Sequence, residues 1–162
     1  MDPVGPLAGM LRDQARANTI ARLELKRSKS DPSAKYFVYV LLLSEGRIYV
    51  GSTDNIYDRL TSHFGMTSSA AAWVKLHGPP VRVLEVIADA DSGAENRKTI
   101  EYMARWGSEL VRGGKWHGVF GTETPSCADS YRPDRLYRSL SRSEIDAIEQ
   151  EVRSNVALLV AH

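Results

Sequence analysis

The sequence predicts an α/β (α+β) fold in which a small three-stranded antiparallel sheet is flanked by helices, with helical extensions at both ends. Three short segments rich in β-branched, aromatic and aliphatic residues, 36–43, 48–50 and 81–87, indicate the strands. Gly46, in the turn between the first two, can supply the positive φ angle of a tight hairpin. Apolar residues that recur at three- or four-residue spacing between and after these segments indicate the helices.

The first predicted helix covers 55–64, directly after the hairpin. Ile56, Leu60 and Phe64 lie four residues apart and form its buried stripe, and residues 51–54 hold candidate N-caps. The spacing therefore predicts a short amphipathic helix that packs against the sheet.

Two further helices are predicted over 68–77 and 93–109. Each is preceded by residues able to cap a helix, namely Ser68 or Ser69 and Asp91 or Ser92. Residues 110–135 are rich in glycine and proline and are predicted as a long loop, which in a compact domain is often functional.

A last helix is predicted near the end of the chain. Ser141 and Glu144 have the spacing of a capping box. One helical face then carries Ile145, Ile148, Val152, Val156 and Leu159. This helix either covers the core or mediates self-association, so a homo-oligomer formed through it is one expected state.

The composition is that of a soluble globular protein, with 43% hydrophobic and 25% charged residues, which excludes a disordered or fibrous chain. The apolar runs are far shorter than the roughly 20 residues that cross a bilayer. Residues 1–9 lack the pattern of a secretory signal, and Cys127 is the only cysteine, which excludes an internal disulfide framework. An intracellular protein, cytoplasmic or nuclear, is expected.

Basic residues gather in two segments, 97–116 and 132–142, although the net charge is only +1. In the first segment, the Arg-Gly-Gly-Lys-Trp stretch makes Arg112 and Lys115 candidate nucleic-acid contacts, through two cations, backbone amides and an aromatic ring. The alternative is that the charges are a solvated surface and the stretch is a glycine-rich turn anchored by Trp116.

The hairpin carries two tyrosine motifs, Val38-Tyr39 and Tyr49-Val50-Gly51, and the next helix carries Arg59 and, one turn later, His63. This set, in the order strand, turn, strand, helix, helix, strand, helix, resembles the GIY-YIG nuclease family. The part from Tyr49 to the end of the first helix is especially similar to the nuclease domains of phage intron-encoded homing endonucleases.

The resemblance covers about residues 36–117 and divides the chain into three parts. We expect an N-terminal helical and linker extension over 1–35, a GIY-YIG-like nuclease core over 36–117, and a loop with a C-terminal amphipathic helix over 118–162.

The resemblance implies a metal-dependent endonuclease that hydrolyses DNA phosphodiester bonds. It assigns the metal site to Glu101, with Mg²⁺ as cofactor and Mn²⁺ as a substitute, because one carboxylate is enough to anchor Mg²⁺ while water and phosphate complete its shell. By resemblance, Tyr39 is the general base, Tyr49 orients water or phosphate, and Arg59 stabilises charge in the transition state. His63 positions a tyrosine or relays a proton.

Each of these residues also has a plain structural interpretation. The tyrosines suit the core of a hairpin, and Glu101 can pair with Arg97 one turn earlier on the same helix. Gly51 permits close approach of the backbone to a phosphate, or merely ends a strand.

The sequence departs from the family pattern after the glutamate. Many family members have an asparagine some fifteen residues beyond it, whereas 110–117 contains none. Either Lys115 or His117 takes the place of this asparagine, or the catalytic activity is weakened. The alternative function is therefore a catalytically weak or inactive nucleic-acid-binding or structural subunit of a larger assembly. Since the termini and the long loop are small, the chain alone is expected to have low sequence specificity, or a protein partner is expected to supply the specificity.

Overall fold

The structure is a computed structural model, and it describes residues 36–91, 93–116 and 138–160. The predictions for 1–35 and for most of the long loop lie outside the described residues. Among the helices that are described, none has the length and apolarity required to cross a membrane.

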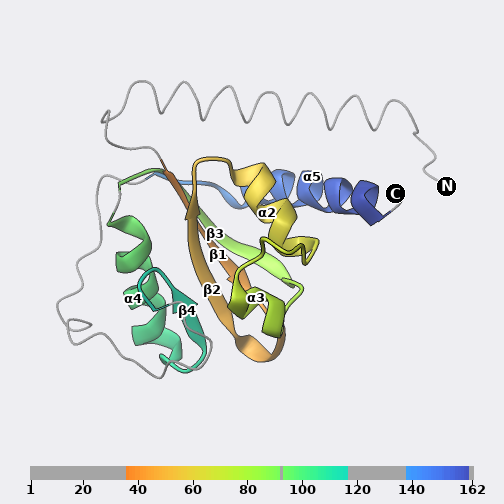
Figure 1. Cartoon of the computed structure of the whole chain (residues 1–162). Coiled ribbons are helices and arrows are strands. Elements are labelled where there is room, and N and C mark those ends of the chain that lie inside the picture. Colours follow the sequence, from red (N-terminus) through yellow and green to blue (C-terminus); the bar gives the residue numbers. More distant parts are fainter. Residues whose placement is uncertain (1–35, 92, 117–137, 161–162) are drawn as a thin grey trace.

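The centre of the molecule is a five-stranded sheet in the order β4-β2-β1-β3-β5 (Figure 1). The middle strand β1 pairs antiparallel with β2 on one side and β3 on the other, while β4 joins β2 in parallel and β5 joins β3 antiparallel. The strands are β1 (Tyr36–Leu42), β2 (Ile48–Thr53), β3 (Arg82–Ala90), β4 (Val111–Gly113) and β5 (Arg138–Ser139).

The prediction of a mixed fold is confirmed, but the sheet has five strands and not three. The two additional strands are the edge strands β4 and β5, of 3 and 2 residues. Segments this short carry no period-two alternation of apolar and polar residues, so the usual sequence signal of a strand is absent.

Helices cover both faces of the sheet (Figure 1). One apolar cluster joins α2, α3 and α5 to the first face, and a second joins α4 to the other face. The helices are α2 (Ile56–Phe64), α3 (Ala72–His77), α4 (Ala94–Trp106) and α5 (Arg142–Val160). The short 3-10 turn η1 (Ser44–Gly46) connects β1 to β2, and Gly46 there has a φ of 74°.

The helix starts differ from those predicted. Asn55 caps α2, and its side chain accepts a hydrogen bond from Asp58 N at 3.2 Å. Neither Ser68 nor Ser69 caps α3, because a turn separates them from Ala72, and Ser69 instead bonds to Ser62 with its hydroxyl.

The end of α4 comes earlier than predicted, at Trp106 rather than at residue 109. Gly107 has a φ of 99°, a conformation that ends a helix and that side chains other than glycine rarely adopt.

The C-terminal helix α5 begins with the predicted capping box. Glu144 N donates to Ser141 Oγ at 3.2 Å, and Ser141 N donates to Glu144 Oε1 at 3.2 Å. Ile145, Ile148 and Val152 are then buried against the sheet and α2. Of the two roles left open for this helix, covering the core is the one observed, and self-association stays a prediction.

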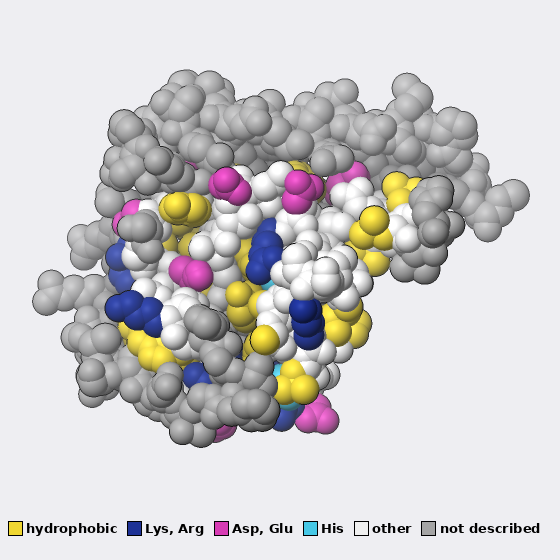
Figure 2. Space-filling model, in the orientation of Figure 1, with side chains coloured by type: hydrophobic (Ala, Val, Ile, Leu, Met, Phe, Trp, Pro, Cys, Tyr) yellow, Lys and Arg dark blue, Asp and Glu magenta, His cyan; other side chains and the backbone are white. Residues whose placement is uncertain are grey.

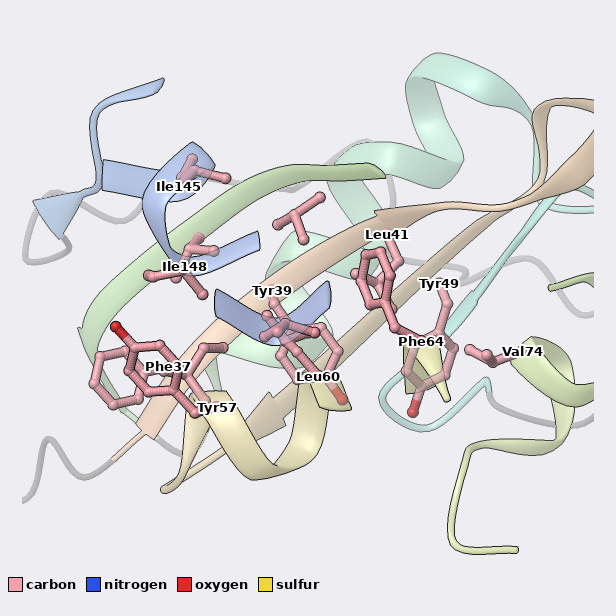
Figure 3. Packing of buried hydrophobic residues seen from close by; sticks show 14 of the residues in the cluster. Phe37, Tyr39, Leu41, Tyr49, Tyr57, Leu60, Phe64, Val74, Ile145 and Ile148 are labelled. Carbon is pink, nitrogen blue, oxygen red and sulfur yellow. The ribbon is translucent and has the colours of Figure 1, made fainter. Parts of the chain in front are cut away.

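The cluster on the α2, α3 and α5 side contains most of the large buried side chains, some of which Figure 3 shows. Tyr39 and Tyr49 enter it from β1 and β2, Leu60 and Phe64 from α2, and Ile148 from α5. Tyr39 and Tyr49 therefore lie on the same face of the sheet, next to α2.

Candidate active site

Tyr39, Tyr49 and His63 meet on the α2 side of the sheet. Tyr39 Oη and His63 Nε2 are 2.7 Å apart in a buried hydrogen bond. The ring centroids of Tyr39 and Tyr49 lie 6.3 Å apart, and those of Tyr49 and His63 lie 5.4 Å apart. Side chains from two strands and one helix therefore converge in one group.

Gly51 makes this arrangement sterically feasible. Tyr39 and Gly51 are direct partners in the β1–β2 register, and a Cβ atom at residue 51 would lie 2.5 Å from Tyr39 Cζ. The phenol ring of Tyr39 therefore crosses β2 through space that any side chain at residue 51 would fill. That its backbone also approaches a phosphate stays a prediction.

His63 is neutral in this environment. Its side chain is fully buried, and burial together with the positive charge of Arg59 lowers its pKa from 6.5 to about 3. Ala71 N donates to His63 Nδ1 at 3.5 Å, which leaves the ring proton on Nε2. In this tautomer, His63 Nε2–H donates to the Tyr39 oxygen.

Both phenols of the pair are held in the protonated form. Burial raises the pKa of Tyr39, the neighbouring Tyr49 raises it further, and Arg59 opposes the rise. Burial likewise raises the pKa of Tyr49, followed by the negative charge of Glu95, and again Arg59 opposes. Arg59 is therefore the cation that favours a phenolate at this site.

Arg59 extends from α2 beside the two tyrosines and remains partly exposed. Its Nη1 donates to Ser69 O at 2.7 Å, which fixes one side of the guanidinium against the turn before α3. Among the described contacts, Arg59 forms no ion pair with Asp58 or Glu101.

Glu101, the predicted metal ligand, is not part of this group. It lies on α4, on the opposite face of the sheet, and pairs with Lys98 Nζ at 2.5 Å and with Arg105 at 3.6 Å. Lys98 in turn binds Glu85, which also accepts from Tyr102 Oη at 2.7 Å. Glu101 therefore belongs to a separate ionic network on α4, and its role as a metal ligand stays a prediction.

Glu95 is a carboxylate whose negative charge acts on both tyrosines. It stands in the first turn of α4, and Ser52 Oγ at the end of β2 donates to its Oε2 at 3.0 Å. After burial, its negative charge is among the causes that raise the pKa of Tyr39 and Tyr49. The N-terminus of α4 therefore brings one carboxylate to the edge of the site.

A single carboxylate at this place suits a divalent cation with few protein ligands. Among the described residues no group of three or more His, Cys, Asp or Glu side chains could form a metal cage. Mg²⁺ does not need one, because it keeps several waters and binds through one or two carboxylates together with substrate phosphate. Glu95, in the first turn of α4, offers such a carboxylate, and Glu101 pairs with Lys98 and Arg105.

A protein-family model matches the part of the chain that carries Tyr39, Tyr49, Arg59 and His63. Residues 35–97 match the sequence model of the GIY-YIG catalytic domain. The chain carries a GIY-YIG domain. Its family is one of nucleases, which are hydrolases. No curated protein and no solved structure matches the chain.

The matched stretch of the GIY-YIG domain contains Tyr39, Tyr49, Arg59, His63 and Glu95 and ends before Glu101. The sequence did hold one signal for Glu95. This residue lies in the first turn of the predicted helix, a position that suits an acidic side chain. Periodicity alone does not say which turn of the helix faces the site. The closer similarity to phage homing endonucleases stays a prediction.

The two cationic residues predicted to contact nucleic acid differ in placement. Lys115 is exposed and lines an open cavity beside Glu95. Arg112 is only 1% exposed, since it stands next to Tyr49 in the β4–β2 register, so its guanidinium lies inside the protein and not on the surface. The described Lys and Arg side chains visible in Figure 2 are interspersed with Asp and Glu and form no continuous basic area.

Proposed function

We propose that this domain is an endonuclease that hydrolyses phosphodiester bonds of DNA with one divalent metal ion held by Glu95. The observation that carries the proposal is the meeting of two phenols, an imidazole, a guanidinium and one carboxylate at the end of the β1–β2 hairpin. Phosphodiester hydrolysis needs a proton acceptor for water, positive charge near the phosphoryl oxygens, and stabilisation of the leaving oxygen.

Tyr39 is the proposed proton acceptor. Its phenolate would be stabilised by two donors, His63 Nε2–H at 2.7 Å and the nearby Arg59 guanidinium. Burial opposes ionisation of Tyr39, and the charge of Glu95 adds to that opposition. Neutralising the Glu95 charge would therefore make Tyr39 easier to ionise.

Arg59 is proposed to bind the phosphoryl oxygens of the substrate. Its planar guanidinium offers several donors in a fixed fork and keeps its charge at any physiological pH. One of its nitrogens is held by Ser69 O, so the group is oriented before a substrate arrives. Tyr49, which is 9% exposed, is proposed to orient the water or the phosphate.

Glu95 is proposed to hold Mg²⁺ or Mn²⁺. When bound, such an ion supplies Lewis-acid stabilisation to the phosphoryl group and the leaving oxygen. The residues themselves position the substrate: Arg59 from α2 and Glu95 from α4 approach it from two different elements.

Cleavage of a supercoiled plasmid and of short DNA and RNA duplexes, with Mg²⁺, with Mn²⁺ and with a chelator, tests the proposal. We expect metal-dependent nicking of DNA, reduced at least about 100-fold by Tyr39→Phe, because a positioned general base contributes about 10² to 10⁴ in rate. Tyr102→Phe is the matched control, since Tyr102 is also a buried tyrosine with a raised pKa but lies on the α4 side. Equal cleavage by Tyr39→Phe and the unchanged protein would remove the assigned role.

The alternative function is a nucleic-acid-binding or structural subunit without cleavage. It is favoured by the absence of an asparagine from 110–117 and by the burial of Arg112. DNA binding without nicking under either metal would select it over the nuclease.

A further inference from the structure

An open cavity of about 380 Å³ lies beside Glu95, between the start of α4, the end of β2 and the turn after β4. Its lining includes the side chains of Tyr36, Ser52, Asp91, Glu95, Asn96 and Lys115. None of these except Glu95 has a part in the proposed chemistry. The cavity therefore adjoins the proposed active site and shares Glu95 with it.

The cavity wall combines an aromatic ring with a cation. Tyr36 is half-buried at the first position of β1, and Lys115 is exposed in the turn after β4. Aromatic rings stack on nucleobases of any sequence, and a lysine ammonium binds the backbone phosphate. The pair is thus suited to one nucleotide, its base against Tyr36 and its phosphate near Lys115.

Lys115 is held at the rim by a contact with α4. Lys115 N donates to Asn96 Oδ1 at 2.9 Å, and Gly114 before it has a φ of 50° and packs directly against the same Asn96. A side chain at residue 114 would collide with the Asn96 amide. The turn therefore lies close on α4, and the position of Lys115 is fixed relative to Glu95.

The acidic side of the cavity determines how a nucleotide would enter. Asp91 pairs with Arg97 Nη2 at 2.6 Å, and Glu95 accepts from Ser52. Carboxylates repel phosphate but accept hydrogen bonds from the amino groups of bases. The base therefore enters toward the carboxylates, and the phosphate stays toward the cation.

We propose that this cavity binds the base of a single unpaired nucleotide next to the scissile phosphate, so that the enzyme prefers DNA with an unpaired nucleotide at the cleavage site over a continuous duplex. The volume lies at the lower end of the range of about 300 to 1,000 Å³ found for ligand sites, which suits one nucleotide and excludes a paired duplex. This inference rests on the proposed function for its catalytic consequence. Its binding part is measurable without cleavage.

The test is the affinity of the full chain for two dye-labelled DNA duplexes, one continuous and one with a single unpaired nucleotide, measured by fluorescence anisotropy with a chelator present. We expect the second duplex to bind at least about five-fold more tightly, since stacking of one base contributes about 1 to 3 kcal/mol. Tyr36→Leu should remove that preference while keeping an apolar residue in β1, and Tyr36→Phe should retain it.

Two cation variants separate base binding from phosphate binding. Lys115→Ala should lower the affinity for both duplexes to a similar degree, because phosphate contacts carry no information about the base. Lys75→Ala, on α3, is the control and should change neither affinity, as its ammonium donates to Ser68 O away from the cavity.

Equal affinity of the unchanged protein for both duplexes, or a preference that Tyr36→Leu leaves intact, would overturn the inference. The cleavage assay reports on the proposed function separately. A preference that depends on Tyr36, without nicking under Mg²⁺ or Mn²⁺, would support the cavity and reject the nuclease.

Discussion

Gly51 and Tyr39 show how one missing side chain shapes the site. The Tyr39 ring reaches His63 across the position that a residue-51 side chain would occupy. The tyrosine motifs therefore have a packing role in addition to their proposed chemistry. Both roles require the same two residues. Measurements of stability report on the packing role, and measurements of activity report on the chemical role.

Gly51→Ala should lower the free energy of unfolding by about 1 to 3 kcal/mol, the usual cost of an added carbon in a packed core. The new Cβ would lie 2.5 Å from Tyr39 Cζ and force that ring to move. In a Tyr39→Leu background the same glycine substitution should cost much less. Urea unfolding of the two single variants and the double variant gives the coupling, and additive effects would show that the ring is not the obstacle.

His63 should make the protein less stable as the pH falls. Its pKa is about 3 in the folded state, where burial and Arg59 disfavour the cation, and 6.5 when unfolded. The unfolded chain therefore binds more protons between these values, and stability drops as the pH falls below 6.5. Between pH 7.5 and 5.5 we expect a loss of about 1.4 kcal/mol from this group alone.

Urea unfolding at those two pH values, for the unchanged protein and for His63→Gln, measures that loss. Glutamine cannot take up a proton in this range, so the variant should lack the histidine contribution. An identical pH dependence in both proteins would show that His63 is not held neutral.

The sequence predicted four of the side chains that meet at the site because their relationship is local. Tyr39 and Tyr49 belong to one hairpin, and Arg59 and His63 are one turn apart on the next helix, so register and helical period determine their placement. The carboxylate depends on how α4 lies against the sheet, which is tertiary information. The choice between Glu95 and Glu101 could not be made from spacing.

At the scale of elements, the periodicity of apolar residues predicted the long strands and helices, but it did not predict the short edge strands. β1, α2 and α5 lie close to where their apolar patterns indicated. β4 and β5 exist because β2 and β3 offer free edges, not because their own residues favour strands. Pairing of this kind is decided by the neighbouring strand.

In β3, Asp89 lowers the stability of the fold at a place where the pairing with β1 is irregular. The register shifts between Tyr36 and Val38 of β1, and on β3 Asp89 has a φ of 59° in this region. Asp89 is 7% exposed, and both of its carboxylate oxygens lack a hydrogen-bond partner in the described part of the chain. A left-handed backbone and a buried acid without partners both destabilise the fold.

Asp89→Gly should therefore raise stability by about 1 kcal/mol or more, since glycine adopts this conformation freely and buries no polar group. Glu45→Gly is the control for backbone conformation alone, because Glu45 has a similar φ of 57° but is exposed. Thermal and urea unfolding of both variants compares the gains. A smaller gain for Asp89→Gly than for Glu45→Gly would mean that the buried carboxylate is not a cost.

At the scale of the whole molecule, the sheet separates two groups of polar side chains. Helices α2, α3 and α5 cover one face of the sheet and α4 covers the other (Figure 1). The first face holds Tyr39, Tyr49 and His63, and the second holds the network of Lys98, Glu85 and Glu101. The first turn of α4 reaches the end of β2, where Ser52 donates to Glu95. The nuclease account depends on this arrangement, since it allows one carboxylate of α4 and excludes the other.

The most direct test is magnesium-dependent nicking of a supercoiled plasmid by Glu95→Gln and Glu101→Gln, each with a melting curve to show that it folds. Glu95→Gln should reduce nicking at least about 100-fold, because metal stabilisation of a phosphoryl group contributes several kcal/mol. Glu101→Gln, whose carboxylate pairs with Lys98 on the other face, should nick within about three-fold of the unchanged protein. Loss of nicking in a folded Glu101→Gln, or full activity in Glu95→Gln, would contradict the account.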